Sequence, residues 1–255
     1  MSEARNMLTD TARTVFAEAK TRGFAPIQEA GFESLLVAEA DGGFGGDYGD
    51  LFAVMRVAGE LAMDQPAGNL QVGEAILSAH LGEDFDASQH CHLGAFLRVG
   101  QTAGALDAAL AMSIAHTNAR EQFGKPLSKQ QAVQQNLAIF ACEAAAVNVA
   151  GQAAARALDL AGESSVSGSD ALFEIAAAKL RTNKAISVAV SIAHQVHGAI
   201  GFTMDYPLHP LTTAMMRWRS EYGNDAYWAE ILGSMASAHG GAGLWAEVTR
   251  RGDLG

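Results

Sequence analysis

Three long stretches with apolar residues at helical spacing occupy the middle of the chain and constrain its fold most. They cover residues 93–116, 128–160 and about 170–197, and alanine is frequent in all three. Alanine is the best helix former, and apolar residues that recur every three or four positions place one face of a helix against a core. Only 5 prolines occur in 255 residues, and no series of segments alternates apolar and polar residues as strands do. The chain is therefore predicted to be all-α.

Shorter helices are predicted on both sides of these three. The expected ranges are 2–22, which Gly23 ends, 50–63, a stretch that begins near Pro207 and Pro210, and a last helix over about 225–238. Between the first two, the four glycines of residues 41–47 predict a loop, because glycine permits tight turns with positive φ. That segment lacks the Lys-Ser/Thr pair of a phosphate-binding P-loop.

The interruption of the helical pattern at residues 81–92 divides the chain. We expect an N-terminal helical domain over 1–80, a connector over 81–92 and a C-terminal four-helix bundle over 93–255. Within the bundle, Ser128 and Gln131 have the spacing of a capping box, which would use Ser128 as the N-cap of a helix. Cys142 lies in an apolar helical run and is expected in the core.

Composition excludes several classes of function. Hydrophobic residues make up 49% of the chain and charged residues 18%, which suits a large core and argues against disorder. The formal net charge of −11 argues against nucleic acid or an anionic membrane surface as the main partner. The two cysteines fit a reducing cytoplasm, which is the expected location. The N-terminus lacks an apolar signal-peptide core, and no uncharged apolar run reaches about 18 residues, so no membrane span is expected.

Two motifs that begin 75 residues apart carry the most specific information. The first is Arg120-Glu-Gln-Phe-Gly-Lys-Pro126, and the second begins Gln195-Val-His-Gly-Ala-Ile-Gly-Phe-Thr. In this order and spacing they resemble the C-terminal helical domain of acyl-CoA dehydrogenases, flavoenzymes that desaturate acyl-CoA thioesters between Cα and Cβ. In that family the two segments hold the ADP half of an FAD that sits mainly in a neighbouring subunit.

The resemblance implies that Arg120, Phe123, Gln195 and Gly198 contact an FAD shared with a partner. A guanidinium suits a pyrophosphate because it stays charged and can bond bidentately. Phe123 would offer a flat apolar face, Gln195 an amide that both donates and accepts, and Gly198 room for the phosphate or ribose. The alternative for Arg120 is the capping of a helix C-terminus, where a cation is favourable. No metal site is predicted.

The second motif also resembles a subset of the family. Its Gln-Val-His-Gly form is similar to that of partner subunits in heteromeric enzymes that act on steroid-CoA and related bulky acyl-CoA substrates. His197 stands where many family members have an aromatic residue. A packing or hydrogen-bonding role is expected for it, with a general-base role as the alternative.

Two parts of the family's catalytic apparatus are missing from the sequence. Acyl-CoA dehydrogenases have a β-barrel domain between their N-terminal helices and the bundle, and the twelve residues of 81–92 cannot hold one. An ungapped carry-over from Tyr206-Pro207 places Tyr222 where the family has its catalytic glutamate, and a tyrosine with a pKa of about 10 is a poor base. Glu221 is the remaining candidate base. A helix would turn it about 100° from that position, so a surface or salt-bridging role is expected.

These observations predict a non-catalytic or half-site subunit of a heteromeric FAD-dependent acyl-CoA dehydrogenase. A longer paralogue would supply the flavin-ring site and the base, and a pair of heterodimers is the expected assembly. The alternatives are a self-sufficient homo-oligomeric dehydrogenase with Glu221 as base, and a structural or interaction protein that has lost FAD. The expected contact surfaces are a Gly100/Gly104 face and a cluster of Trp218, Tyr227 and Trp228, with a core position as the alternative for the aromatic residues.

Overall fold

The chain folds almost entirely into helices, as expected from its sequence. The computed structural model describes residues 3–62, 70–82, 87–122, 124–162, 169–238 and 240–252. In chain order the elements are α1 (Glu3–Arg22), α2 (Ala25–Glu29), the 3₁₀ helices η1 (Phe32–Ser34) and η2 (Glu39–Asp41), α3 (Tyr48–Glu60), α4 (Leu70–Leu81), α5 (Ala87–Ala119), β1 (Glu121–Gln122), β2 (Lys125–Pro126), the 3₁₀ helix η3 (Leu127–Lys129), α6 (Gln131–Ala161), α7 (Ser169–His197), the 3₁₀ helix η5 (Gly198–Phe202), α8 (Leu208–Trp218), α9 (Asp225–Ala238) and α10 (Gly240–Gly252). The only strands in these ranges form one short hairpin.

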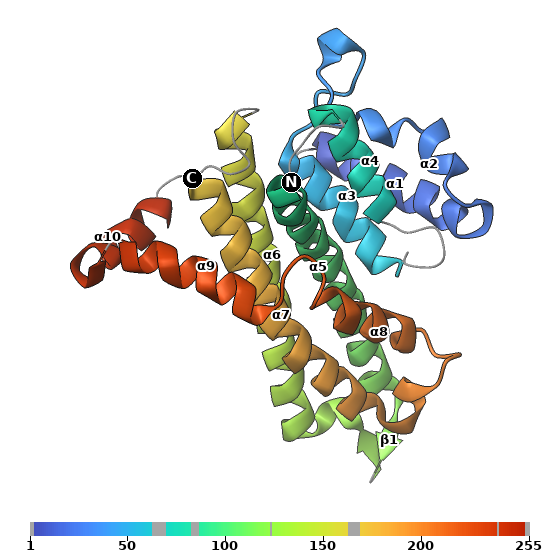
Figure 1. Cartoon of the computed structure of the whole chain (residues 1–255). Helices are drawn as coiled ribbons and strands as arrows, with labels where there is room; N and C mark the ends of the chain where they lie inside the picture. The colour runs from blue at the N-terminus through green and yellow to red at the C-terminus, as the bar shows by residue number, and fades with distance from the viewer. Residues whose placement is uncertain are drawn as a thin grey trace.

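The bundle is built around three long helices, α5, α6 and α7, which lie side by side in Figure 1. The shorter α8 packs against α5 and α7, and α9 packs across α7. The N-terminal helices α1 to α4 gather at one end, where α3 contacts both α5 and α6. At the opposite end lie the hairpin of β1 and β2 and the turn from α7 into α8.

Helix α5 is the central element of the core. Residues 92–106 are buried without interruption, because α3 covers one side of this segment and α6 and α7 cover the other. A helix that is covered all round is mostly apolar or small, and a buried polar side chain in it needs a partner, as Arg98 has in Glu221 and Gln101. The N-terminal helices and the bundle therefore share one hydrophobic core.

Glycines allow α3 and α5 to touch through their backbones. A Cβ atom on Gly104 would lie 1.8 Å from the carbonyl oxygen of Arg56, and one on Gly59 would lie 1.8 Å from that of Gln101. Gly100 likewise packs against Met55 of α3. The expectation that Gly100 and Gly104 form a contact surface between subunits is therefore wrong, because α3 of the same chain covers them.

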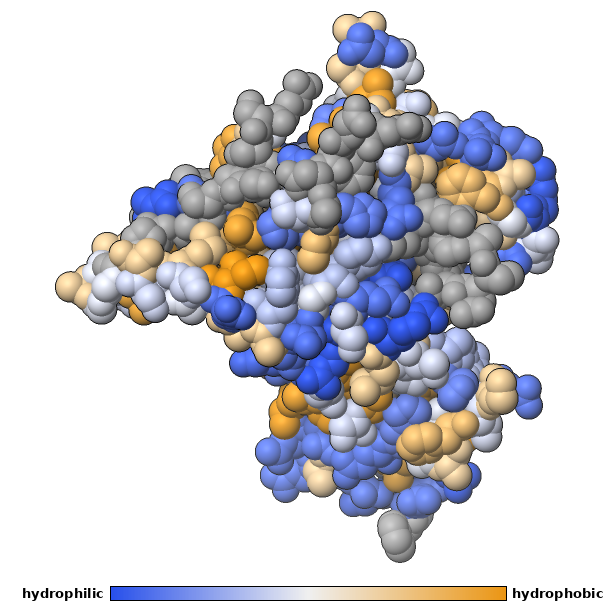
Figure 2. Space-filling view, viewed as in Figure 1, coloured by the Kyte–Doolittle hydropathy of each residue, from blue (hydrophilic) through white to orange (hydrophobic). Residues whose placement is uncertain are grey.

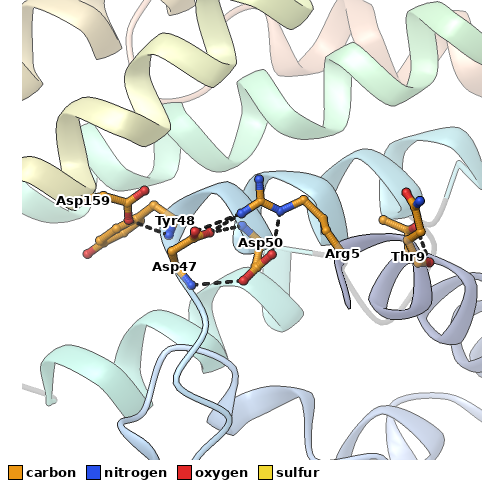
Figure 3. Close-up of polar contacts among 7 residues, drawn as sticks. Arg5, Thr9, Asp47, Tyr48, Asp50 and Asp159 are labelled. Atoms are coloured by element: carbon orange, nitrogen blue, oxygen red, sulfur yellow. Dashed lines mark hydrogen bonds and ion pairs between the residues drawn. The ribbon is translucent and has the colours of Figure 1, made fainter. Parts of the chain in front are cut away.

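Polar contacts tie the N-terminal helices to the bundle at the start of α3 (Figure 3). Arg5 of α1 donates from Nε to Asp50 over 2.6 Å and forms a second ion pair with Asp47. Asp47 is the N-cap of α3 and forms a capping box with Asp50. The backbone nitrogen of Tyr48 donates to Asp159 of α6 over 2.8 Å. One helix N-terminus thus joins three elements.

Several expected helix boundaries are wrong. Helix α5 begins at Ala87 rather than at 93, because the polar residues 88–90 belong to its first turns. Helices α4 and α10 were not predicted, and α10 follows the helix that was expected to be the last. The capping box at Ser128 is also wrong, since Ser128 lies in η3 and α6 has Gln130 as its N-cap without a side-chain bond.

The structure contradicts the predicted burial of Cys142 and decides the position of the aromatic residues. Cys142 is exposed on α6, so its expected core position is wrong. Trp218 and Trp228 are fully buried, which assigns them to the core, whereas Tyr227 is partly exposed. By length and apolar composition alone, α6 and the stretch 170–202 could each span a membrane. In the structure these two helices pack against each other as members of the bundle.

Candidate functional site

A cleft of about 610 Å³ lies at the end of the bundle where α5 and α7 finish. It is bounded by the hairpin, by η3 with the first turns of α6, and by η5. Its described lining consists of His116, Arg120, Gln122, Leu127, Gln130, Ala132, Val133, Asn136, Gln195, Val196, His197, Gly198, Ala199 and Ile200. No carboxylate is among these residues, so the described wall of the cleft can attract an anion without opposing charge.

The hairpin places Arg120 at the mouth of this cleft. Helix α5 ends at Ala119, and the chain then forms β1 and β2, with Glu121 opposite Pro126. Gly124 adopts a φ of +74° in the turn, a conformation that favours glycine. The loop closes where the backbone nitrogen of Leu127 donates to the carbonyl of Arg120 over 2.8 Å. Arg120 is exposed, and no described carboxylate pairs with it.

The second motif forms the opposite wall at the end of α7. Gln195 lies in the last turn, and its Oε1 accepts a hydrogen bond of 3.5 Å from Asn136 Nδ2 of α6. Gly198 follows the helix with a φ of +64°, which turns the chain into η5. A Cβ atom on Gly198 would meet nothing within 4 Å, so the space beside this backbone is open.

Two stacked imidazoles also line the cleft. The rings of His116 and His197 lie 4.5 Å apart and 28° from parallel. His197 is buried, and its Nδ1 lies 2.8 Å from the carbonyl oxygen of Ala193. Burial lowers the pKa of His197. Burial also lowers the pKa of His116, and the neighbouring His197 and Arg120 lower it further. Both shifts favour the neutral form of the ring.

The candidate base Glu221 is not part of this cleft. It lies beyond the C-terminus of α8 and forms ion pairs with Arg98, at 2.5 Å, and with Arg217, at 3.2 Å. The expected salt-bridging role is thus what the structure shows. Tyr222 has a φ of +54° and donates its hydroxyl to Glu74 over 3.2 Å. Burial raises the pKa of Tyr222 to about 12, which suits a packing residue and not a base.

The structure brings together three of the four residues predicted to contact FAD. Arg120, Gln195 and Gly198 line the same cleft, and Phe123 lies outside the described residues. Sequence reasoning missed His116 and Asn136. A signal for His116 was available, because it precedes Arg120 by one helical turn and so shares its face of α5. No comparable signal marked Asn136, whose position depends on how α6 packs against α7.

Comparison with known proteins assigns the chain to a family. The family model described as acyl-CoA dehydrogenase, C-terminal domain, matches residues 87–237, which is more than half of the chain. The acryloyl-CoA reductase (NADH) of Anaerotignum propionicum is 28% identical over 179 residues, which make up 70% of this chain and 43% of that protein. The chain therefore spans less than half the length of this curated relative.

Solved structures share the fold at low sequence identity. A variant of the Tcur3481-Tcur3483 steroid ACAD has a TM-score of 0.72 at 17% identity, with 94% of this chain and 99% of that chain covered. The ChsE4-ChsE5 complex from Mycobacterium tuberculosis also gives a TM-score of 0.72, at 15% identity, with 92% and 97% covered. Both structures thus match nearly the whole length of this chain, including its N-terminal helices. Through its matched C-terminal domain, the chain belongs to the acyl-CoA dehydrogenase family.

Proposed function

We propose that this chain is a half-site subunit of a heteromeric, FAD-dependent acyl-CoA dehydrogenase. The observation that carries the proposal is the convergence of Arg120, Gln195 and Gly198, from motifs far apart in sequence, on one cleft without a carboxylate in its described lining. These residues suit the ADP half of FAD. Arg120 would pair with the pyrophosphate, Gln195 would bond a ribose or phosphate oxygen, and Gly198 would leave room for it.

A partner would have to supply the parts of the active site that the described residues of this chain do not form. FAD, when bound, would accept the hydride from the β carbon of an acyl-CoA. The described residues of this chain form no β domain around a flavin ring, and Glu221 is neutralised by two arginines. The partner, a longer paralogue, would therefore supply the flavin-ring site and the base. The two solved complexes named above support a heteromer, and a steroid side-chain CoA is the proposed substrate class by analogy with the first.

Exposed apolar side chains beside the cleft support a partner at this end of the bundle. Phe202 and Met204 are largely exposed, and Ile200 both lines the cleft and reaches the surface. On the face shown in Figure 2, orange apolar patches lie among blue residues on the lower bundle. Apolar surface beside a binding cleft is typical of a surface that another chain covers.

The proposal is tested by flavin content. We expect the chain purified alone to retain little FAD and the complex with its longer paralogue to retain it. Arg120→Ala should weaken FAD retention of the complex about ten- to a hundredfold, since the lost bonds are charge-assisted. Arg156→Ala, which removes an exposed arginine of α6 outside the cleft, is the matched control. Equal flavin affinity in the Arg120 variant would contradict the proposal. A complex that binds no FAD would favour a structural role.

A further inference from the structure

The stacked imidazoles of the cleft differ in which of them can take up a proton. The carbonyl of Ala193 can only accept, so His197 Nδ1 donates to it and carries the ring's hydrogen. The other nitrogen, Nε2, is buried and has no partner among the described residues. Protonating it would leave a charged donor buried without an acceptor, which is costly. In the ligand-free cleft, burial therefore favours the neutral form of His197.

His116 is placed to take up the proton instead. It is half-buried, lines the cleft and precedes Arg120 by one turn of α5. One face of its ring is stacked on His197, so the ring is held in position rather than free in solvent. Burial lowers the pKa of His116 most, and His197 and Arg120 lower it further. A diphosphate bound between His116 and Arg120 would offset the repulsion from Arg120 and attract a proton to His116.

Other charged groups near this end of α5 do not face the cleft. Lys125 of β2, Lys129 of η3 and His209 of α8 belong to elements that pack against α5, but none of them lines the cleft. His194 of α7 is bonded to Thr212 and stacked on Phe202, and it too is outside the lining. Glu121 of β1 is exposed and also lies outside it. Arg120 is therefore a permanent positive charge in the lining, and His116 is the group beside it that can gain a proton when an anion binds.

We propose that His116 is a positioning residue, which takes up a proton when a diphosphate-bearing ligand enters the cleft and then pairs with it alongside Arg120. The ligand class is a nucleotide whose diphosphate is esterified at both ends, so this inference rests on the proposed function. Binding is then coupled to proton uptake, and affinity rises as the pH falls toward the range in which histidine ionises. Each unit by which the ligand raises the pKa of His116 can increase affinity up to about tenfold at low pH.

The experiment is calorimetric titration of the flavin-free complex of this chain and its longer paralogue with ADP-ribose, whose pyrophosphate does not titrate near neutral pH. Measurements at about pH 6.5, near the ordinary pKa of histidine, in buffers of different ionisation enthalpy give the protons taken up per ligand bound. We expect a clear fractional uptake in the wild type. His116→Phe keeps a ring on His197 but cannot titrate, so its uptake should fall to near zero and its affinity should lose the pH dependence. His209→Asn is the matched control and should behave as the wild type.

The outcomes separate this inference from the proposed function. Binding of ADP-ribose without proton uptake, or with the same uptake in His116→Phe, overturns the role of His116 and leaves the nucleotide cleft intact. No binding even at millimolar ligand overturns the cleft as a nucleotide site, and this inference with it. His116→Gln serves as a second non-titrating variant, and the circular dichroism of each variant shows whether it is folded.

Discussion

Lys179 is a buried side chain outside the lining of the cleft, and it bonds to the C-terminal end of α8. Its Nζ donates to Asn183 Oδ1 over 2.9 Å and to the carbonyl of Trp218 over 2.8 Å, with Arg219 as a longer third acceptor. These carbonyls belong to the last turn of α8, where a cation is favourable. Burial lowers the pKa of Lys179 to about 7, against the ordinary value of 10.5.

This lowered pKa predicts how the stability of the chain depends on pH. Between about pH 7 and 10 the unfolded chain binds more protons at Lys179 than the folded chain does. The free energy of unfolding should therefore rise with pH in this window, by up to about 1.4 kcal/mol per unit. Lys179→Met should lose this rise and be destabilised by about 1–3 kcal/mol, because buried carbonyls lose their donor. Urea unfolding at several pH values tests this. A free energy of unfolding that changes with pH in the same way in both proteins would contradict it.

At the scale of elements, the contact between α3 and α5 depends on glycine. Gly104→Ala would place a methyl group against the backbone of α3, so the helices would have to separate. We expect a destabilisation of about 1–3 kcal/mol or more. The control is Gly233→Ala on α9, where a Cβ meets nothing within 4 Å and helix propensity predicts a gain of up to about 1 kcal/mol. Urea unfolding of both variants measures the two changes in the free energy of unfolding. Equal changes would show that α3 and α5 can move apart at Gly104 without loss of stability.

The same contact shows what the sequence could and could not predict. The periodicity of 93–116 and 128–160 predicted long helices correctly, since that signal is local. The partner of Gly104 was not predicted, because a small residue does not indicate which element approaches it. The start of α5 was missed because polar residues on an exposed turn have no apolar period. In the cleft, the residues of the two motifs were found from sequence, but Asn136 depends on packing between α6 and α7.

At the scale of the whole molecule, we expect the isolated chain to have no acyl-CoA dehydrogenase activity. Glu221 is held by Arg98 and Arg217, and Tyr222 is a half-buried packing residue with a raised pKa. Dye reduction with a panel of acyl-CoA substrates, including bulky steroid ones, should show turnover only when the partner is present. In that complex, Glu221→Gln should leave turnover unchanged. Turnover by the chain alone that Glu221→Gln abolishes would instead support a self-sufficient enzyme.

The uninterrupted burial of residues 92–106 limits how the N-terminal helices and the bundle can be exchanged between relatives. Helix α5 is covered by α3 on one side and by α6 and α7 on the other. The N-terminal helices and the bundle therefore bury their apolar side chains in the same core. A chimaera that joins the first 80 residues of one relative to the bundle of another would combine core side chains that do not fit together. We expect such a chimaera to be less stable than either parent. We therefore expect the N-terminal helices and the bundle to unfold together as one cooperative unit.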